Sequence, residues 1–300
     1  MSDEQSRKQS AEASVSLMLT TLDLAPTDDP SGLDAFVGGS EPMPHGRVFG
    51  GQVLAQCVVA ASRTVDDELR VHSMHGYFLR PGDPDKPITF TVDRIHDGRS
   101  FAARRTQAFQ DGEPIFSMIA SFQREEDGLE HFVPMPEGIA LPEDLPAIED
   151  RMSFEHPLTR RLISDRPVEV RHVTAPIYLT PDPEHTSSQA LWIRIRRTIG
   201  DDPTLHAAVL AYITDISIQE PILRAHGLAW SNPRLKLASL DTALWWHRPA
   251  RVDEWLLYVQ ESPSASSGRG LATGRLYTRE GMLLASVSQE VVVRVGTAKS

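Results

Sequence analysis

Cysteine occurs only once among the 300 residues, at Cys57. An intrachain disulfide is therefore impossible, and no cysteine cluster can hold a metal ion. The opening stretch MSDEQSRKQSAEAS is polar and lacks the basic segment and apolar core of a secretory signal. Both absences predict a protein of the reducing cytoplasm.

Long apolar runs are also missing, since no stretch approaches the ~20 residues that a transmembrane helix needs. Basic residues are fewer than acidic ones, 30 against 41, and the formal net charge is -11. This balance argues against nucleic-acid binding, which requires a basic surface. An anionic small molecule such as a nucleotide thioester stays open, because local arginines can hold it.

The first half combines one long apolar run with strand-like segments. Gly50 and Gly51 precede a run rich in Val, Ala and Leu that lasts to about Thr64, which predicts a buried helix. A shorter helix is expected over 14–24. Asp-Gly pairs between the later segments are hairpin signals. Strands are expected over 71–79, 88–96, 100–110 and 115–123.

The second half repeats this plan. Asp202 and Pro203 predict a helix start, with an acidic cap followed by proline in the first turn. The apolar run 205–213 follows, and the helix is expected to end by His226-Gly227. Strands are expected over 235–247, 255–261, 271–279 and 282–295.

Three landmarks recur between the halves at nearly constant separation. They are Arg80-Pro81 with Arg248-Pro249, Gly98-Arg99-Ser100 with Gly268-Arg269-Gly270, and Asp111-Gly112 with Glu280-Gly281, at offsets of 168, 170 and 169 residues. A repeat of this length indicates a duplicated domain. Each helix must bury its apolar face against its own strands, so two such units joined edge to edge are expected.

The chain accordingly divides into four predicted parts. A polar segment covers 1–30, a first unit covers 31–135 and a second unit covers 171–296. Between the units, 136–170 continues a stretch rich in proline and acidic residues. This composition suits a linker on the surface, and no regular structure is expected there.

Eight segments spanning both halves resemble the type II acyl-CoA thioesterases, the family of bacterial thioesterase II and its peroxisomal relatives. They are RVFGGQVLAQ (47–56), VHSMHGYFLRPGD (71–83), GRSFAARR (98–105), IASFQ (119–123), ASLDTALWWHRP (238–249), EWLLY (254–258), SPSASSGRG (262–270) and ASVSQE (285–290). The resemblance implies an α+β double hotdog, in which two helix-wrapped antiparallel sheets fuse into one. It also implies a homo-oligomer that hydrolyses fatty acyl-CoA to CoA and a free fatty acid.

The resemblance also implies a catalytic trio. The family's Asp, Ser or Thr, and Gln fall on Asp215, Ser239 and Gln289 of this chain. The family usually has His directly after the Asp of the Ser-Leu-Asp segment, whereas this chain has Thr242 there. That replacement bears on packing or substrate fit near Ser239.

The residue types of the trio suit thioester hydrolysis by an activated water molecule. A carboxylate can accept the proton of the water, while a hydroxyl and a carboxamide can orient it. If the leaving thiol resembles a cysteine side chain, its pKa is near ~8.5 and a strong general acid is dispensable. No covalent intermediate, metal ion or cofactor is therefore expected.

Further residues are candidates for substrate binding. Gly50 and Gly51 open a helix N-terminus whose N–H groups could meet an oxyanion, although close helix–sheet packing explains them equally well. Four arginines are candidates for contact with CoA phosphates, although most of them are better explained as solvent-exposed surface charges. These arginines are Arg99, Arg104, Arg105 and Arg269.

Other readings remain open at this point. The strand histidines His72, His75 and His247 lack a spacing such as His-Glu-x-x-His, so no metal site is expected. A hotdog hydratase would carry His five residues after the Asp, where this chain has Glu220. A non-catalytic protein that binds or senses acyl-CoA is the other alternative, although it would have no need of the trio.

Overall fold

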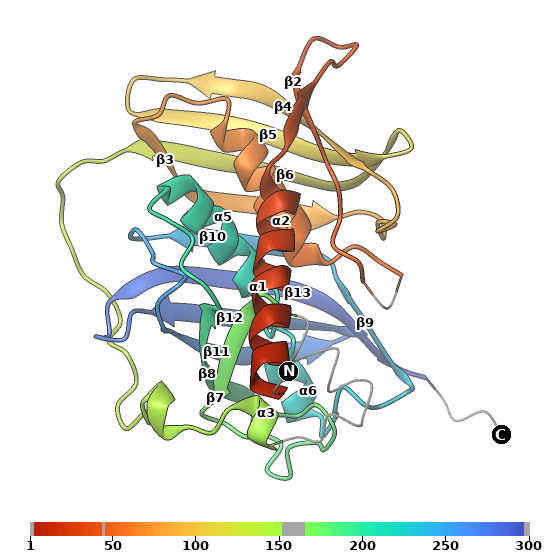
Figure 1. The fold of residues 1–300 in the computed structure, drawn as a ribbon, viewed down its shortest axis with the longest axis vertical. Coiled ribbons are helices and arrows are strands. Elements are labelled where there is room, and N and C mark those ends of the chain that lie inside the picture. Colours follow the sequence, from red (N-terminus) through yellow and green to blue (C-terminus); the bar gives the residue numbers. More distant parts are fainter. Residues whose placement is uncertain (1–2, 44–45, 152–165, 297–300) are drawn as a thin grey trace.

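The computed structural model describes residues 3–43, 46–151 and 166–296 of the chain. Its main feature is an antiparallel sheet of 13 strands (Figure 1). The strands are β1 (Ala25–Thr27), β2 (Asp34–Gly38), β3 (Leu69–Phe78), β4 (Ile88–Asp97), β5 (Phe101–Gln110), β6 (Glu113–Arg124), β7 (Val168–His172), β8 (Ser188–Ile195), β9 (Leu235–Ser239), β10 (Asp241–Trp246), β11 (Leu256–Ser266), β12 (Arg269–Tyr277) and β13 (Leu283–Val295). The helices are α1 (Asp3–Leu22), α2 (Gly50–Ser62), the 3-10 turn η1 (Pro142–Asp144), α3 (Ile148–Arg151), α5 (Pro203–Thr214) and α6 (Glu220–Ala225).

The sheet runs without interruption from one half of the chain into the other. Its strand order is β1-β2-β4-β5-β6-β3-β10-β13-β12-β11-β8-β7, and β9 pairs with β13 off this path. At the junction of β3 with β10, Tyr77 lies opposite Asp241 and Ser73 opposite Trp245. Outward from this junction, β3-β6-β5-β4 corresponds to β10-β13-β12-β11. The predicted fusion of two antiparallel sheets into one is confirmed.

Helix α2 lies between the first-half strands and helix α5 (Figure 1). Every residue from 51 to 61 is buried, and the two polar side chains among them, Gln52 and Gln56, hydrogen-bond to each other at 3.0 Å. Cys57 is fully buried there, and burial raises the pKa of its thiol. The thiol is therefore inert, and the buried helix predicted after Gly51 is confirmed.

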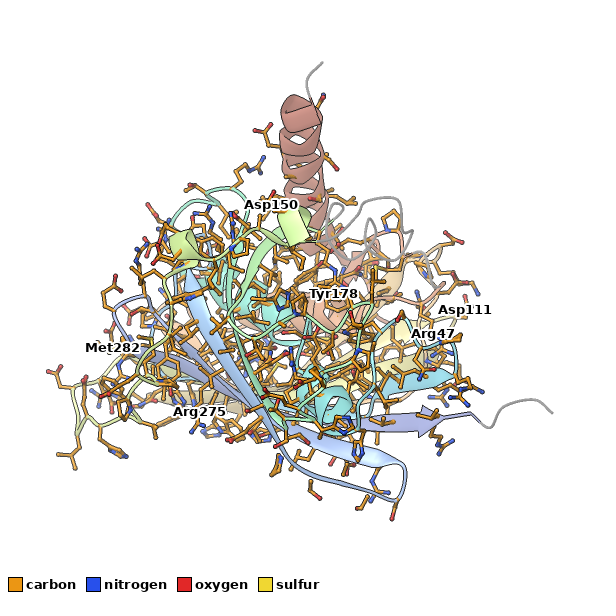
Figure 2. The ribbon with its side chains drawn as sticks, turned by 90° about the horizontal axis from the view of Figure 1, so that it is seen from below. Arg47, Asp111, Asp150, Tyr178, Arg275 and Met282 are labelled. Atoms are coloured by element: carbon orange, nitrogen blue, oxygen red, sulfur yellow. The ribbon has the colours of Figure 1, made fainter. Side chains whose placement is uncertain are left out.

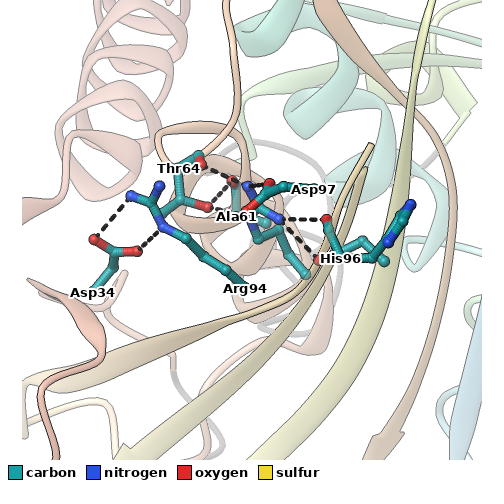
Figure 3. A network of polar contacts seen from close by, with 8 residues as sticks. Asp34, Ala61, Thr64, Arg94, His96 and Asp97 are labelled. Atoms are coloured by element: carbon teal, nitrogen blue, oxygen red, sulfur yellow. Dashed lines mark hydrogen bonds and ion pairs between the residues drawn. The ribbon is translucent and has the colours of Figure 1, made fainter. Parts of the chain in front are cut away.

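The C-terminal end of α2 is tied to the β4–β5 hairpin by Arg104, whose side chain is only 1% exposed. Its guanidinium donates to the hydroxyl and the carbonyl oxygen of Thr64, each at 2.8 Å. It also donates to the His96 carbonyl at 3.0 Å and pairs with Asp97 at 2.5 Å (Figure 3). The suggestion that Arg104 could meet a CoA phosphate is wrong, because the fold uses and buries this group.

The second-half helix is interrupted where one helix was expected to continue. Helix α5 ends at Thr214 with Asp215 as its C-cap, and α6 begins at Glu220. Pro221 explains the interruption, since proline lacks an N–H and its ring would clash with the carbonyl four residues earlier. The expected start and finish hold, because Asp202 caps α5 and Gly227 adopts φ +58 after α6.

A second interruption divides the segment expected as one strand over 235–247. Strands β9 and β10 both pair with β13, and Leu240 lies between them with its N–H bonded to the Glu290 carbonyl. The interruption leaves Ser239 as the last residue of β9.

Several elements were not expected from the sequence. Strands β1, β2 and β8 were unassigned, and α1 begins at Asp3, well before the expected helix over 14–24. The predicted linker 136–170 contains η1, α3 and the start of β7, while 152–165 lie outside the described residues. Within the described ranges, no helix combines the length and apolar character needed to cross a membrane.

Candidate active site

Three side chains that are far apart in the sequence converge at the end of α5. Asp215 caps this helix, Ser239 ends β9 and Gln289 lies within β13. The Gln289 amide donates to Asp215 Oδ1 at 2.7 Å and to Ser239 Oγ at 2.9 Å. Ser239 Oγ lies 3.5 Å from Asp215 Oδ1, so the structure brings the expected trio together.

The Asp215 carboxylate is buried and receives a hydrogen bond from the other half of the molecule. The Gly51 N–H, in the first turn of α2, donates to Asp215 Oδ2 at 2.8 Å. Burial raises the pKa of Asp215 to about 6, and the hydrogen bonds from Gln289, Gly51 and Ser239 oppose that rise. A carboxyl with this pKa is ionised at neutral pH yet basic enough to accept a proton.

One acceptor position on this carboxylate is left over. A carboxylate offers about four lone-pair positions. Gln289 and Ser239 approach Oδ1, and Gly51 approaches Oδ2. The remaining lone pair therefore belongs to Oδ2, where a water molecule could donate a hydrogen bond.

The glycine pair allows α2 to approach Asp215 this closely. A Cβ on Gly50 would lie 2.6 Å from Asp215 Oδ2, and a Cβ on Gly51 would lie 2.5 Å from the Tyr212 carbonyl oxygen. Neither distance is tolerable for a real side chain. The missing Cβ of Gly50 therefore lets the backbone of α2 pack directly against Oδ2.

Gly50, Asp215 and Ser239 border a cavity of about 820 Å³. Tyr178 and Arg47, both labelled in Figure 2, line it from different halves of the chain. Its apolar lining includes Leu17, Val53, Phe78, Ile115, Phe116, Ile216 and Trp230. Its polar lining includes Glu41, Arg166, Asp215, Gln219, Glu220 and Ser239. A cavity of this size and mixed character can hold a small-molecule substrate.

Two further carboxyl groups of the cavity were not predicted from the sequence. Glu41 accepts a hydrogen bond from the Tyr212 hydroxyl at 3.0 Å, and burial raises its pKa to about 7. Glu220, the residue at the hydratase position, accepts from Trp230 Nε1 at 3.0 Å, and burial raises its pKa. No motif marks either residue, since their burial depends on how the two halves pack.

The predicted arginines lie away from the cavity. Arg99 and Arg269 are exposed at hairpin turns, and neither lines it. Arg269 pairs with Glu290 at 3.0 Å. Contact of either arginine with CoA phosphates stays a prediction.

The strand histidines fit packing roles. His75 meets the edge of Trp245 with ring centroids 5.1 Å apart, and His72 and His247 bond serine hydroxyls at 2.8 and 2.9 Å. A search of the described ranges for three or more metal-binding side chains in one place finds none.

Comparison with known proteins gives a consistent result. The model of the acyl-CoA thioesterase N-terminal domain matches residues 40–123, and that of the C-terminal domain matches residues 142–293. The chain is 36% identical to human acyl-coenzyme A thioesterase 8 over 292 residues, which cover 93% of this chain and 89% of that protein.

Solved structures agree with these sequence matches. An acyl-CoA thioesterase II, TesB2 from Mycobacterium marinum, aligns with TM-score 0.75 and 38% identity, covering 93% of this chain and 99% of that one. A hot dog fold protein from Alicyclobacillus acidocaldarius aligns with the same TM-score at 18% identity, covering 94% and 99%. The fold is therefore the double hotdog that the resemblance implied.

Proposed function

This chain belongs to the acyl-CoA thioesterase family and is an acyl-CoA hydrolase, and we propose that Asp215, Ser239 and Gln289 activate the water that cleaves its substrate. The observation that carries this assignment is the unoccupied lone pair on Asp215 Oδ2. This oxygen lies against the backbone of Gly50, and both Asp215 and Gly50 line the cavity.

The reaction needs no covalent intermediate. Water held at Asp215 Oδ2 attacks the thioester carbon and forms the new C–O bond, while its proton passes to the carboxylate. The C–S bond then breaks, and the leaving thiolate takes up the proton held by Asp215. General-base assistance of this kind is worth roughly 10²- to 10⁴-fold in rate.

The N-terminus of α2 supports the developing oxyanion. Its first-turn N–H groups have no carbonyl partner within the helix, and the helix dipole places partial positive charge there. The Gly51 N–H donates to Asp215, whereas Gly50, the first residue of α2, lines the cavity. We assign the Gly50 N–H as an oxyanion donor, a role worth about 3–4 kcal/mol for one good donor.

The substrate is a fatty acyl-CoA, and the reaction requires no cofactor. The sequence left open a protein that only binds or senses acyl-CoA, and the relatives named acyl-CoA thioesterases favour hydrolysis instead. A homo-oligomeric assembly and a cytoplasmic location stay predictions, of which the first can be checked by light scattering.

Replacing Asp215 by Asn tests the assignment. Release of free thiol from a panel of short to long acyl-CoAs should fall by a factor of roughly 10² to 10⁴, because the water loses its base. Calorimetric binding of CoA should persist. Asp241→Asn is the matched control, since Asp241 lies outside the cavity lining and accepts the Glu290 N–H at 3.1 Å.

Two outcomes would contradict the proposal. Unchanged hydrolysis by the Asp215→Asn variant would remove the base from the mechanism. Tight binding without thiol release by the wild-type protein, for every chain length, would favour the sensing alternative.

A further inference from the structure

We propose that Gln219 is a positioning residue for this hydrolysis and that it restricts Ser239 to donating its proton; the inference rests on the proposed function. Gln219 lies in the turn between α5 and α6, as the N-cap of α6. It makes no capping hydrogen bond with its side chain. Instead its Nε2 lies 3.3 Å from Ser239 Oγ, and the residue lines the cavity.

The argument follows from counting the hydrogen bonds of one hydroxyl. A serine hydroxyl has one proton to donate and two lone pairs to accept with. The Gln289 amide donates to Ser239 Oγ at 2.9 Å, and the Gln219 amide donates to the same oxygen at 3.3 Å. Both lone pairs of Ser239 Oγ then accept hydrogen bonds from amide groups, one from a residue before Ser239 in the sequence and one from a residue after it.

Ser239 is left with a single role. Its proton can be directed to Asp215 Oδ1, 3.5 Å away, or to a group in the cavity. It cannot accept the proton of the attacking water, and it has no free lone pair for attack on the thioester carbon. Asp215 is therefore the base for the water, and an acyl-serine intermediate is suppressed.

The direction of the hydrogen bonds at Ser239 also affects Asp215. A hydroxyl that accepts two amide hydrogen bonds is a better donor, so its bond to the carboxylate becomes stronger. The other charged or titratable groups coupled to Asp215 are Arg166, Tyr212 and Tyr258, of which Arg166 and Tyr212 line the cavity. None of these donates to Ser239, so a change at residue 219 reports on the hydroxyl separately from them.

The experiment compares Gln219→Leu with Gln219→Glu in the full-length protein, with kcat, KM and the pH profile measured by thiol release. Leucine keeps the apolar bulk and removes the donor. Its kcat should fall roughly tenfold with little change in KM, and the acidic limb of the profile should move to higher pH. A purely structural role would not move that limb.

The glutamate variant tests the direction of the hydrogen bond. Protonated Glu can donate to Ser239 at low pH, whereas ionised Glu can only accept and would draw the serine proton away from Asp215. Activity of Gln219→Glu relative to wild type should therefore be highest at acidic pH and fall as the new carboxyl ionises. Gln107→Glu, on β5 and outside the cavity lining, is the control for added charge.

Two results would overturn the inference while leaving the proposed function intact. One is a Gln219→Leu variant with wild-type kcat and pH profile alongside an inactive Asp215→Asn variant. The other is a Gln219→Glu variant that is fully active at alkaline pH, which would mean that Ser239 donates to residue 219. Activity in Asp215→Asn, by contrast, would refute the proposed function itself.

Discussion

At the residue scale, Asp215 is held between two opposing requirements. Burial makes the carboxyl basic, while three hydrogen bonds keep it ionisable near neutral pH. The same carboxyl is reached by the α2 N-terminus only because Gly50 and Gly51 lack side chains. Two substitutions separate these requirements.

Gly50→Ala should push the start of α2 away from Asp215 Oδ2 without removing any catalytic group. The new Cβ would lie 2.6 Å from that oxygen and 3.1 Å from the Phe78 ring. Because a displacement of about 1 Å in an active site can cost around 10² in rate, we expect a loss of that order in kcat. Gly39→Ala is the control, since nothing lies within 4 Å of its Cβ position. Equal activity of the two variants would contradict a need for this close approach of α2 to Asp215.

Asp215→Asn should also change how stability depends on pH. The pKa of Asp215 rises from 3.8 to about 6, so the folded protein binds this proton more tightly than the unfolded chain does. Its contribution to stability is full below pH 3.8 and is lost as the pH rises through about 6, a change of roughly 3 kcal/mol.

Asparagine does not titrate, so the variant should gain unfolding free energy relative to wild type between pH 4 and pH 8. Urea unfolding of both proteins at the two pH values measures this difference. A difference that is the same at both pH values would contradict the pKa assigned to Asp215.

The sequence predicted the trio but only part of its surroundings. Short motifs flank Ser239 and Gln289, so the resemblance could assign them one by one. The bond from Gly51 to Asp215 joins residues 164 positions apart and depends on the packing of α2 against α5. Gln219 and Glu41 belong to no motif, and only the folded chain gives them a role.

At the scale of elements, the two arginines of β5 illustrate how neighbouring residues diverge. Arg104 points into the fold and is 1% exposed, whereas Arg105 points outward and pairs with Asp93 at 2.9 Å. Sequence alone could not rank them, because strand alternation does not say which face is covered until the helix is placed.

Arg104→Met should therefore destabilise the protein far more than Arg105→Met. The first change leaves the Thr64 and His96 carbonyl groups without their donor, and each unsatisfied buried acceptor costs about 1–3 kcal/mol. The second removes a surface pair worth about 0–1 kcal/mol. Urea unfolding measures both, and kcat at low temperature should be unchanged in each. Similar stability of the two variants would contradict the buried role of Arg104.

The interruption between α5 and α6 was only half predictable. The cap at Asp202 and the end near Gly227 follow from local chemistry. The apolar run gave no warning of a break, although Pro221 contained the necessary signal. The break matters, because it makes Asp215 a helix terminus and brings Gln219 to Ser239.

At the scale of the whole molecule, the continuous sheet predicts cooperative unfolding. Strands β3 and β10 pair along five residues, and α2 packs against α5 across the same boundary. We expect one calorimetric transition, with equal calorimetric and van't Hoff enthalpies. Arg104→Met, a first-half change, should lower the midpoint of that single transition. Two separate transitions would mean that the halves fold independently.

The duplicated halves are unequal in chemistry. His75 lies opposite Ala243 at the junction of the two halves. On their other sides, His75 pairs with Ile119 and Ala243 pairs with Ser288, so Ile119 and Ser288 occupy equivalent positions. The first-half counterpart of Gln289 is therefore Ala120, which is buried and cannot hydrogen-bond through its side chain. The reacting side chains all come from the second half.

The Gly51 N–H shows what the first half contributes to the site. The first half supplies no reacting side chain, yet its Gly51 N–H holds the carboxylate of Asp215 in the second half. A mutation that disrupts the helix beginning at Gly50 would then abolish turnover, although every reacting side chain remained intact. Hydrolysis therefore depends on both halves, and a gene that lost either one would encode no hydrolase.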